Sequence, residues 1–153
     1  MSFRSSSSYG KRKEYKAIAK LLELNFDVYE TIVDDQGIDC IIRINSRRYV
    51  EIQLKARSIK NCVLKDRGYF PQLSISQPRD NYFFILYSEH ADSYWVIPSL
   101  HIVDMGRKGG FNVSQMKNGP NKGKYSVRVA GSKCNPLPQF EKYKNEIGLA
   151  LLK

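Results

Sequence analysis

Four polar residues of types that can bind a metal ion and activate water lie close together in the sequence: Asp39, Glu51, Gln53 and Lys55. The last three alternate with apolar residues, so a β-strand would place them in one row on the same face. Asp39 follows a Gly-Ile pair and opens the preceding apolar stretch. If the two stretches pair as a hairpin, Asp39 lies beside Gln53 and Lys55. A solvated edge strand would show the same alternation.

The chemistry that such a group supports is the hydrolysis of a phosphodiester bond. Mg²⁺ takes oxygen ligands from one or two carboxylates, from phosphates and from water. A lysine beside the ion can orient or deprotonate the attacking water, because the pKa of its ammonium group shifts readily in such surroundings. Asp39 is therefore a candidate ligand for Mg²⁺ or Mn²⁺, the amide oxygen of Gln53 can complete or orient the shell, and Lys55 is the candidate partner of the water.

The segment Gly37-Ile38-Asp39, followed after a spacer by Gln53-Leu54-Lys55, resembles the PD-(D/E)xK nuclease superfamily, which includes restriction enzymes, Holliday-junction resolvases and a few homing endonucleases. The resemblance implies a restriction-endonuclease-like α/β fold, with a mixed β-sheet flanked by helices in the order αβββαβ. It also implies a metal-dependent endodeoxyribonuclease. Gln53 stands in the acidic position, as in the Gln-x-Lys branch that looks like Mrr-type nucleases. Glu51, two residues upstream on the same face, is the alternative carboxylate.

Glu14 is a further candidate, contributed by the first helix. A helix is predicted over residues 10–25 because large apolar residues recur at helical spacing: Tyr15, Ile18, Leu22 and Phe26. Glu14 lies at the edge of this stripe, and by helix geometry alone it is a solvated residue that pairs with a neighbouring lysine. Junction resolvases and related members of the superfamily carry a glutamate on the first helix, so the resemblance implies that Glu14 is catalytic and binds the metal.

The rest of the chain predicts further elements of the same mixed domain. Besides the two hairpin strands, strands are expected over residues 27–33, 82–87, 94–97 and 125–129. The apolar residues of 61–76 fit neither the spacing of a strand nor that of a helix, and we expect a loop with a partial helix or an added hairpin. A final helix is expected over 140–152, with Tyr143, Ile147 and Leu151 on one stripe. We expect a single nuclease domain, residues 1–153, with a flexible start at residues 1–9.

The charge of the chain predicts a polyanionic partner. It has 25 Lys and Arg against 15 Asp and Glu, a net charge of +10. DNA fits better than a membrane, because the sequence shows no spanning apolar run, basic amphipathic helix or lipidation motif. Residues 105–138 are glycine-rich, basic and free of acidic residues, as in a solvated loop or in an excursion that follows DNA phosphates. The predicted DNA contacts are Lys11, Lys13, Arg43, Arg47, Arg57, Arg107, Lys108, Lys117, Lys122 and Lys124.

These features together predict a Mg²⁺-dependent, site-specific endonuclease of double-stranded DNA, most like a small intron-encoded homing endonuclease. Because one site cuts one strand, we expect a symmetric dimer or tetramer. We expect it in the cytoplasm, associated with the nucleoid when bound to DNA. A Holliday-junction resolvase and a restriction or defence nuclease are the alternatives within the family. In a different class, Gln53 in an acidic position also fits a non-catalytic DNA-binding module on a nuclease scaffold.

Overall fold

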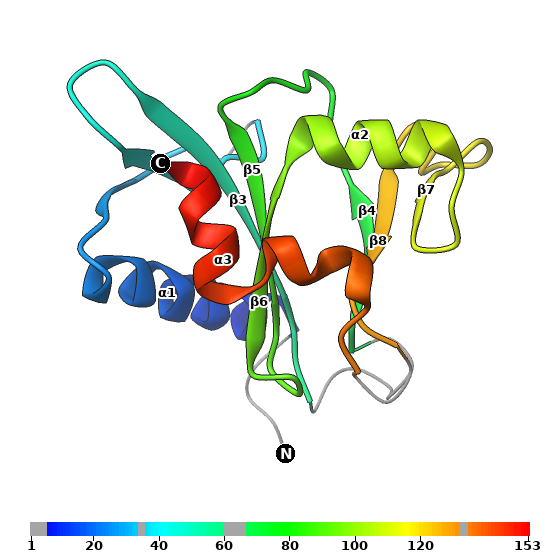
Figure 1. Ribbon diagram of the computed structural model, residues 1–153, viewed down its shortest axis with the longest axis horizontal. Coiled ribbons are helices and arrows are strands. Elements are labelled where there is room, and N and C mark those ends of the chain that lie inside the picture. The colour runs from blue at the N-terminus through cyan, green and yellow to red at the C-terminus, as the bar shows by residue number, and fades with distance from the viewer. Residues whose placement is uncertain (1–5, 34–35, 60–66, 132–134) are drawn as a thin grey trace.

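The computed structural model describes residues 6–33, 36–59, 67–131 and 135–153. The chain forms a five-stranded and a three-stranded β-sheet with helices packed around them (Figure 1). The larger sheet has the order β1-β2-β3-β5-β6, and the smaller has the order β4-β8-β7. The strands are β1 (Asp27–Glu30), β2 (Cys40–Arg43), β3 (Tyr49–Arg57), β4 (Tyr69–Leu73), β5 (Tyr82–Ser88), β6 (Ser93–Pro98), β7 (Val113–Gln115) and β8 (Tyr125–Arg128).

The larger sheet is mixed, as the resemblance implies. Strands β3 and β5 run parallel, and its other neighbouring strands pair antiparallel. Strand β5 is apolar at almost every position because both faces of the sheet are covered. Phe84 and Leu86 belong to one buried cluster, and Phe83 and Ile85 belong to the other. We call the two sides the α2 face and the α1 face, after the helices that cover them.

Helix α1 (Ser6–Glu23) packs on the α1 face through Leu21, with Ala17 and Ile18 partly buried beside it. The predicted helix is confirmed, and its predicted apolar stripe is right in part, because Ile18 and Phe26 pack against the core but two other members do not. Tyr15 and Leu22 are 51% and 52% exposed, because the buried side of the helix is rotated away from them. The helix also starts earlier than expected: residues 6–9 form its first part, and residues 1–5 lie outside the described ranges.

Helix α2 (Ser99–Lys108) was not predicted and covers the opposite face together with the smaller sheet (Figure 1). It begins directly after Pro98 and buries Ile102 and Val103. The predicted basic excursion, residues 105–138, is therefore only partly loop. It contains the end of α2, strands β7 and β8, and the start of the C-terminal segment, while residues 132–134 lie outside the described part of the chain.

Two other predicted segments differ in detail. Between β3 and β5, residues 69–73 form strand β4, which pairs with the distant β8 and not with a neighbour in sequence; residues 60–66 are not among those described. The predicted final helix is broken into η2 (Pro138–Tyr143), α3 (Asn145–Leu149) and η3 (Ala150–Leu152). Lys144 is extended there (φ −86°, ψ 134°). The predicted stripe is consequently wrong: Tyr143 is buried, but Ile147 is 62% exposed.

None of the helices in the described ranges combines the length and the apolar character that a bilayer crossing requires.

Candidate active site

The β2–β3 hairpin opens at the position of the predicted site. The two strands pair in register as far as Cys40 and Ile52, and the backbone N–H of Asp39 still donates to the carbonyl of Ile52 (2.8 Å). Beyond this point the backbone N–H of Leu54 donates to the carboxylate of Asp39, at 2.6 Å from Oδ2. A side chain thus replaces the backbone of β2 as the partner of β3.

This contact brings Asp39 beside the predicted Gln53 and Lys55. Leu54 stands between those two residues in the sequence, and the carboxylate of Asp39 is bonded to its N–H. Gln53 lies opposite Phe84 of β5, so its side chain is on the α2 face of the sheet. Gln53 is only 8% exposed, whereas Lys55 is half-buried. The predicted hairpin, with Asp39 at its open end, is confirmed.

Gln53 is held on two sides. The hydroxyl of Tyr82 donates to its Oε1 at 3.1 Å. On the other side the loop approaches so closely that a Cβ atom at Gly37 would lie 2.9 Å from Nε2 of Gln53. Gly37 also has a φ of +71°, which side-chain-bearing residues rarely adopt. The glycine two residues before Asp39 is therefore required both by the backbone and by the Gln53 amide.

Glu51, the alternative carboxylate, shares the strand but is engaged elsewhere. Arg79 donates to its Oε2 from Nε (2.7 Å) and from Nη2. The guanidinium of Arg79 also lies 4.6 Å from the centre of the Tyr82 ring. Arg79 and Tyr82 were not singled out from the sequence. In the sequence, Arg79 is a charged residue shortly before an apolar strand, and Tyr82 is the first residue of that strand. Neither feature indicates which side chain the residue contacts.

Glu14 lies on α1, half-buried, and pairs with Lys11 at 3.0 Å. The hydrogen bond to Glu14 raises the pKa of Lys11, against the opposing effect of partial burial, and the negative charge of Asp39 raises it further. Lys11 is thus within electrostatic reach of both carboxylates. The ion pair expected from helix geometry is present, and it lies in the neighbourhood of Asp39.

The donor set fits a hard divalent cation that shares its shell with substrate. In the described part of the chain, no three His, Cys, Asp or Glu side chains come together as a ready-made metal cluster. Asp39 offers two carboxylate oxygens, and the carboxylate of Glu14 acts on the same lysine, Lys11, whereas Oε1 of Gln53 is already bonded to Tyr82. Mg²⁺ commonly takes one or two carboxylates from the protein and completes its shell with phosphate oxygens and water.

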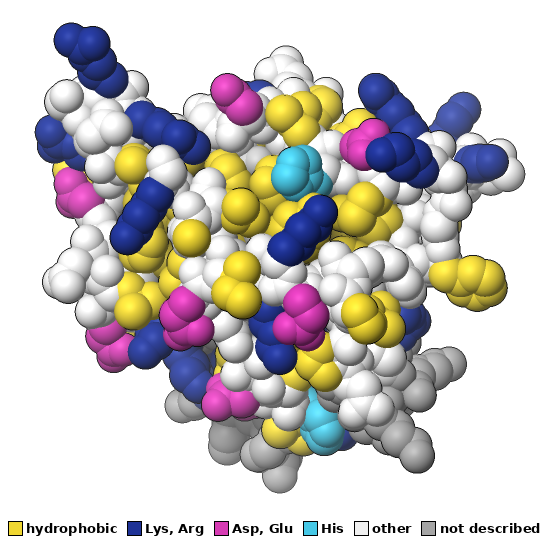
Figure 2. All heavy atoms as spheres, viewed as in Figure 1, with side chains coloured by type: hydrophobic (Ala, Val, Ile, Leu, Met, Phe, Trp, Pro, Cys, Tyr) yellow, Lys and Arg dark blue, Asp and Glu magenta, His cyan; other side chains and the backbone are white. Residues whose placement is uncertain are grey.

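The predicted DNA contacts lie in several places. Figure 2 shows Lys and Arg side chains gathered over the β2–β3 hairpin and, at the other end, over the end of α2 and the β7–β8 loop. Among them, Arg43, Arg47, Arg107, Lys108, Lys117 and Lys122 are exposed. Others already have partners in the fold: Lys13 pairs with Glu89 at 2.6 Å, and Arg57 donates to the carbonyl of Tyr69 at 2.7 Å.

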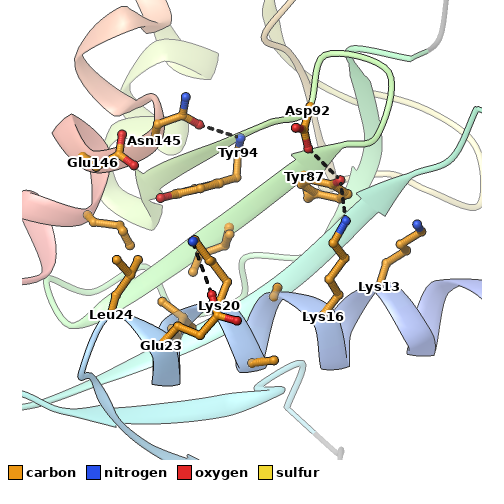
Figure 3. A pocket seen from close by; sticks show the side chains of 15 residues that line it. Lys13, Lys16, Lys20, Glu23, Leu24, Tyr87, Asp92, Tyr94, Asn145 and Glu146 are labelled. Atoms are coloured by element: carbon orange, nitrogen blue, oxygen red, sulfur yellow. Dashed lines mark hydrogen bonds and ion pairs between the residues drawn. The ribbon is translucent and has the colours of Figure 1, made fainter.

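A cavity of about 480 Å³ between α1 and α3 lies away from this site, on the α1 face (Figure 3). Both basic and acidic side chains line it, and some of them pair with one another. Lys20 pairs with Glu23 at 3.3 Å, and Lys16 approaches the hydroxyl of Tyr87 at 3.5 Å. Lys13 is the one predicted contact residue in its lining. The cavity therefore has no part in the chemistry expected at Asp39.

Comparison with solved structures identifies the fold. The chain matches the structure of a bacterial homing endonuclease, I-Ssp6803I, with a TM-score of 0.55 and 17% sequence identity, over 96% of this chain and 91% of that one. Comparisons of the sequence with protein-family models and with curated proteins give no significant match. At this identity the likeness concerns the fold. The restriction-endonuclease-like α/β architecture implied by the Gly37–Asp39 and Gln53–Lys55 segments is confirmed, and this protein has the fold of a homing endonuclease.

Proposed function

We propose that this protein is a Mg²⁺-dependent DNA endonuclease. The observation that carries the proposal is the hydrogen bond between Asp39 and Leu54, which sets a carboxylate beside Gln53 and Lys55. A carboxylate, an amide and an ammonium group at one edge of a strand suit phosphodiester hydrolysis. The fold shared with a homing endonuclease and the net charge of +10 support DNA as the substrate.

Each residue has a distinct role in the proposed site. Asp39 would hold the metal ion, and Glu14, which pairs with Lys11 in this structure, would be its second carboxylate. The chemistry that Mg²⁺ would supply is stabilisation of the negative charge on the phosphate. Lys55 orients the attacking water by donating a hydrogen bond from its ammonium group. Gln53 fixes the geometry beside Asp39. Glu51 can serve as a ligand only after Arg79 has released it, which makes it the weaker candidate.

We further propose that the enzyme is of the homing type and acts as a symmetric oligomer. The fold match supports the first part. The second follows from chemistry, because cutting both strands of a duplex requires two copies of a site that cuts one. The exposed cations of the β2–β3 hairpin and of the β7–β8 loop bind phosphates on either side of the cut. A mass measurement in solution, with and without DNA, tests the oligomer.

The test of the activity is cleavage of a pool of supercoiled plasmids in Mg²⁺ by the wild type, by Asp39→Asn and by the matched control Asp27→Asn. Asp27 is an exposed acid on β1 of the same sheet. We expect wild type and control to cut, and Asp39→Asn to bind DNA without cutting. Cutting that survives in Asp39→Asn would place the active site elsewhere. Faster cutting of a four-way junction than of any duplex would favour a junction resolvase.

A second candidate function rests on Gln53. An amide in place of a carboxylate weakens metal binding, as expected of a DNA-binding module that has lost catalysis. Tight, salt-sensitive DNA binding with no cleavage of plasmid or junction in Mg²⁺ or Mn²⁺ would favour this function. Asp39→Asn would then leave DNA affinity unchanged in the presence and in the absence of Mg²⁺.

A further inference from the structure

We infer that Tyr82 is a positioning residue that orients the amide of Gln53. Its hydroxyl donates to Oε1 of Gln53 at 3.1 Å and lies 3.4 Å from the carbonyl of Gly37. Both side chains are buried: Tyr82 is 3% exposed and Gln53 is 8% exposed. With Oε1 bonded to Tyr82, Nε2 is the amide atom nearest to the Gly37 loop, which leads directly into Asp39.

An amide needs such a partner where a carboxylate does not. The two oxygens of an ionised carboxylate are equivalent acceptors, so either orientation presents the same chemistry. The two ends of an amide differ, since one accepts and the other donates. A hydroxyl fixed at one end selects between the two orientations. Gln53 stands where related nucleases carry an acid, and Tyr82 supplies the orientation that this substitution makes necessary.

Tyr82 is itself held firmly. Its ring lies 5.2 Å from the ring of Phe84, centre to centre, and 4.6 Å from the guanidinium of Arg79. Arg79 is fixed in turn by the carboxylate of Glu51 and by Ser99, whose hydroxyl accepts from the backbone N–H of Arg79 and donates to its carbonyl. Residues of β3, β5 and the start of α2 thus hold the ring of Tyr82, either directly or through Arg79. The ion pair between Glu51 and Arg79 thereby helps to hold the Tyr82 ring in place.

The inference rests on the proposed nuclease function, and a double-mutant cycle tests it. The variants are Tyr82→Phe, Gln53→Ala and their combination, assayed for the single-turnover cleavage rate at saturating Mg²⁺ and DNA. Tyr82→Phe keeps the ring and its packing and removes one oxygen. We expect about a tenfold lower rate from Tyr82→Phe, the size of one hydrogen bond, with unchanged DNA affinity. In the Gln53→Ala background the same substitution should change the rate less than twofold.

Two further variants separate positioning from general structure. Tyr94→Phe is the matched control, because Tyr94 also lies in this sheet and its buried hydroxyl has no hydrogen-bond partner among the described residues; it should leave the rate unchanged. Gln53→Glu should reduce the effect of Tyr82→Phe, because a carboxylate needs no orientation.

Two results would overturn the inference: an unchanged rate in Tyr82→Phe, or the same tenfold loss in the Gln53→Ala background. Absence of cleavage by the wild type would instead remove the proposed function, and this inference with it.

Discussion

The carboxylate of Asp39 and the backbone N–H of Leu54 lie 2.6 Å apart, at the point where strand β3 runs past the end of β2. The same carboxylate therefore extends the pairing of the hairpin and binds the backbone between Gln53 and Lys55. Removing it changes both the fold and the chemistry. Variants at this position must be chosen so that the two effects are seen separately.

Asp39→Asn and Asp39→Ala make that separation. Asparagine keeps an oxygen that accepts from Leu54, so we expect stability close to that of the wild type. We expect the cleavage rate to fall by about 100-fold or more. Alanine also leaves the buried N–H of Leu54 without a partner, at a cost of about 1–3 kcal/mol. Urea denaturation and single-turnover cleavage measure the two effects. Equal stability of the two variants would contradict the structural role of the carboxylate.

Lys55→Met should abolish most of the cleavage while leaving the fold intact. Methionine keeps the length and the apolar contacts of the half-buried side chain and removes the ammonium group. Loss of a positioned group that acts on the attacking water lowers rates by about 10²–10⁴-fold. Lys20→Met is the control, because Lys20 forms an exposed pair with Glu23 on α1. Comparable rates for the two variants would remove Lys55 from the mechanism.

Gly37→Ala should destabilise the protein and slow cleavage. The new Cβ meets Nε2 of Gln53 at 2.9 Å, in a backbone conformation with φ +71°. Gly119→Ala is a matched control, since Gly119 has φ +80° and open space around it. Both variants bear the backbone cost of about 1 kcal/mol, and only Gly37→Ala displaces the amide. Thermal unfolding and cleavage rate are measured for both; we expect slower cleavage from Gly37→Ala alone.

Lowering the pH should weaken the contact between helix α1 and Glu89, which follows strand β5. Burial alone would raise the pKa of Glu89, but hydrogen bonds from Lys13, the backbone of Ile59 and Tyr9 outweigh it and lower the pKa to about 2. A carboxyl whose pKa is lower in the folded state stabilises the fold at pH values above about 4.5. That contribution is lost as the pH falls from 4.5 towards 2.

Urea denaturation of the wild type and of Glu89→Gln between pH 7 and pH 2.5 measures this contribution. The wild type should be more stable at pH 7, and the difference should shrink steadily below pH 4.5. A difference that stays constant down to pH 2.5 would show that the ionised carboxylate does not tie α1 to the sheet.

The exposed lysines of the β7–β8 loop should contribute to DNA affinity through phosphates. Lys117→Gln and Lys122→Gln should weaken binding to all sequences alike and make its salt dependence less steep. The slope of log K against log salt changes by about 0.9 for each phosphate that the protein no longer neutralises. Fluorescence anisotropy at several salt concentrations measures it, with Lys20→Gln as the control. An unchanged slope in both variants would remove this loop from the DNA interface.

Much of the sheet could be predicted because its strands have strong local patterns. Alternation over Val50–Lys55 and the apolar run of β5 identify strands without any knowledge of their neighbours. The opposition of Asp39 to Gln53 follows from pairing two adjacent strands through a short turn. These are short-range relationships, so the pattern of side chains along the chain is enough to recover them.

The contacts that could not be predicted join segments far apart in the chain. Tyr82 reaches Gln53 only because β5 is parallel to β3, in a register that no local pattern encodes. The exposure of Tyr15 depends in the same way on how α1 is rotated against the sheet. The break near Lys144 brings the carbonyl oxygen of Tyr143 so close to Gly148 that a Cβ atom there would lie 1.9 Å away, a contact that the helical pattern of the sequence does not indicate.

Strand β3 has different neighbours along its length. Its first part is paired with β2, whereas from Gln53 onward its edge on that side is bonded to a side chain of the loop before β2. On its other side the same portion of β3 stays paired with β5 as far as Arg57. The edge that lacks a neighbouring strand can therefore admit a ligand while the opposite edge keeps the strand in the sheet.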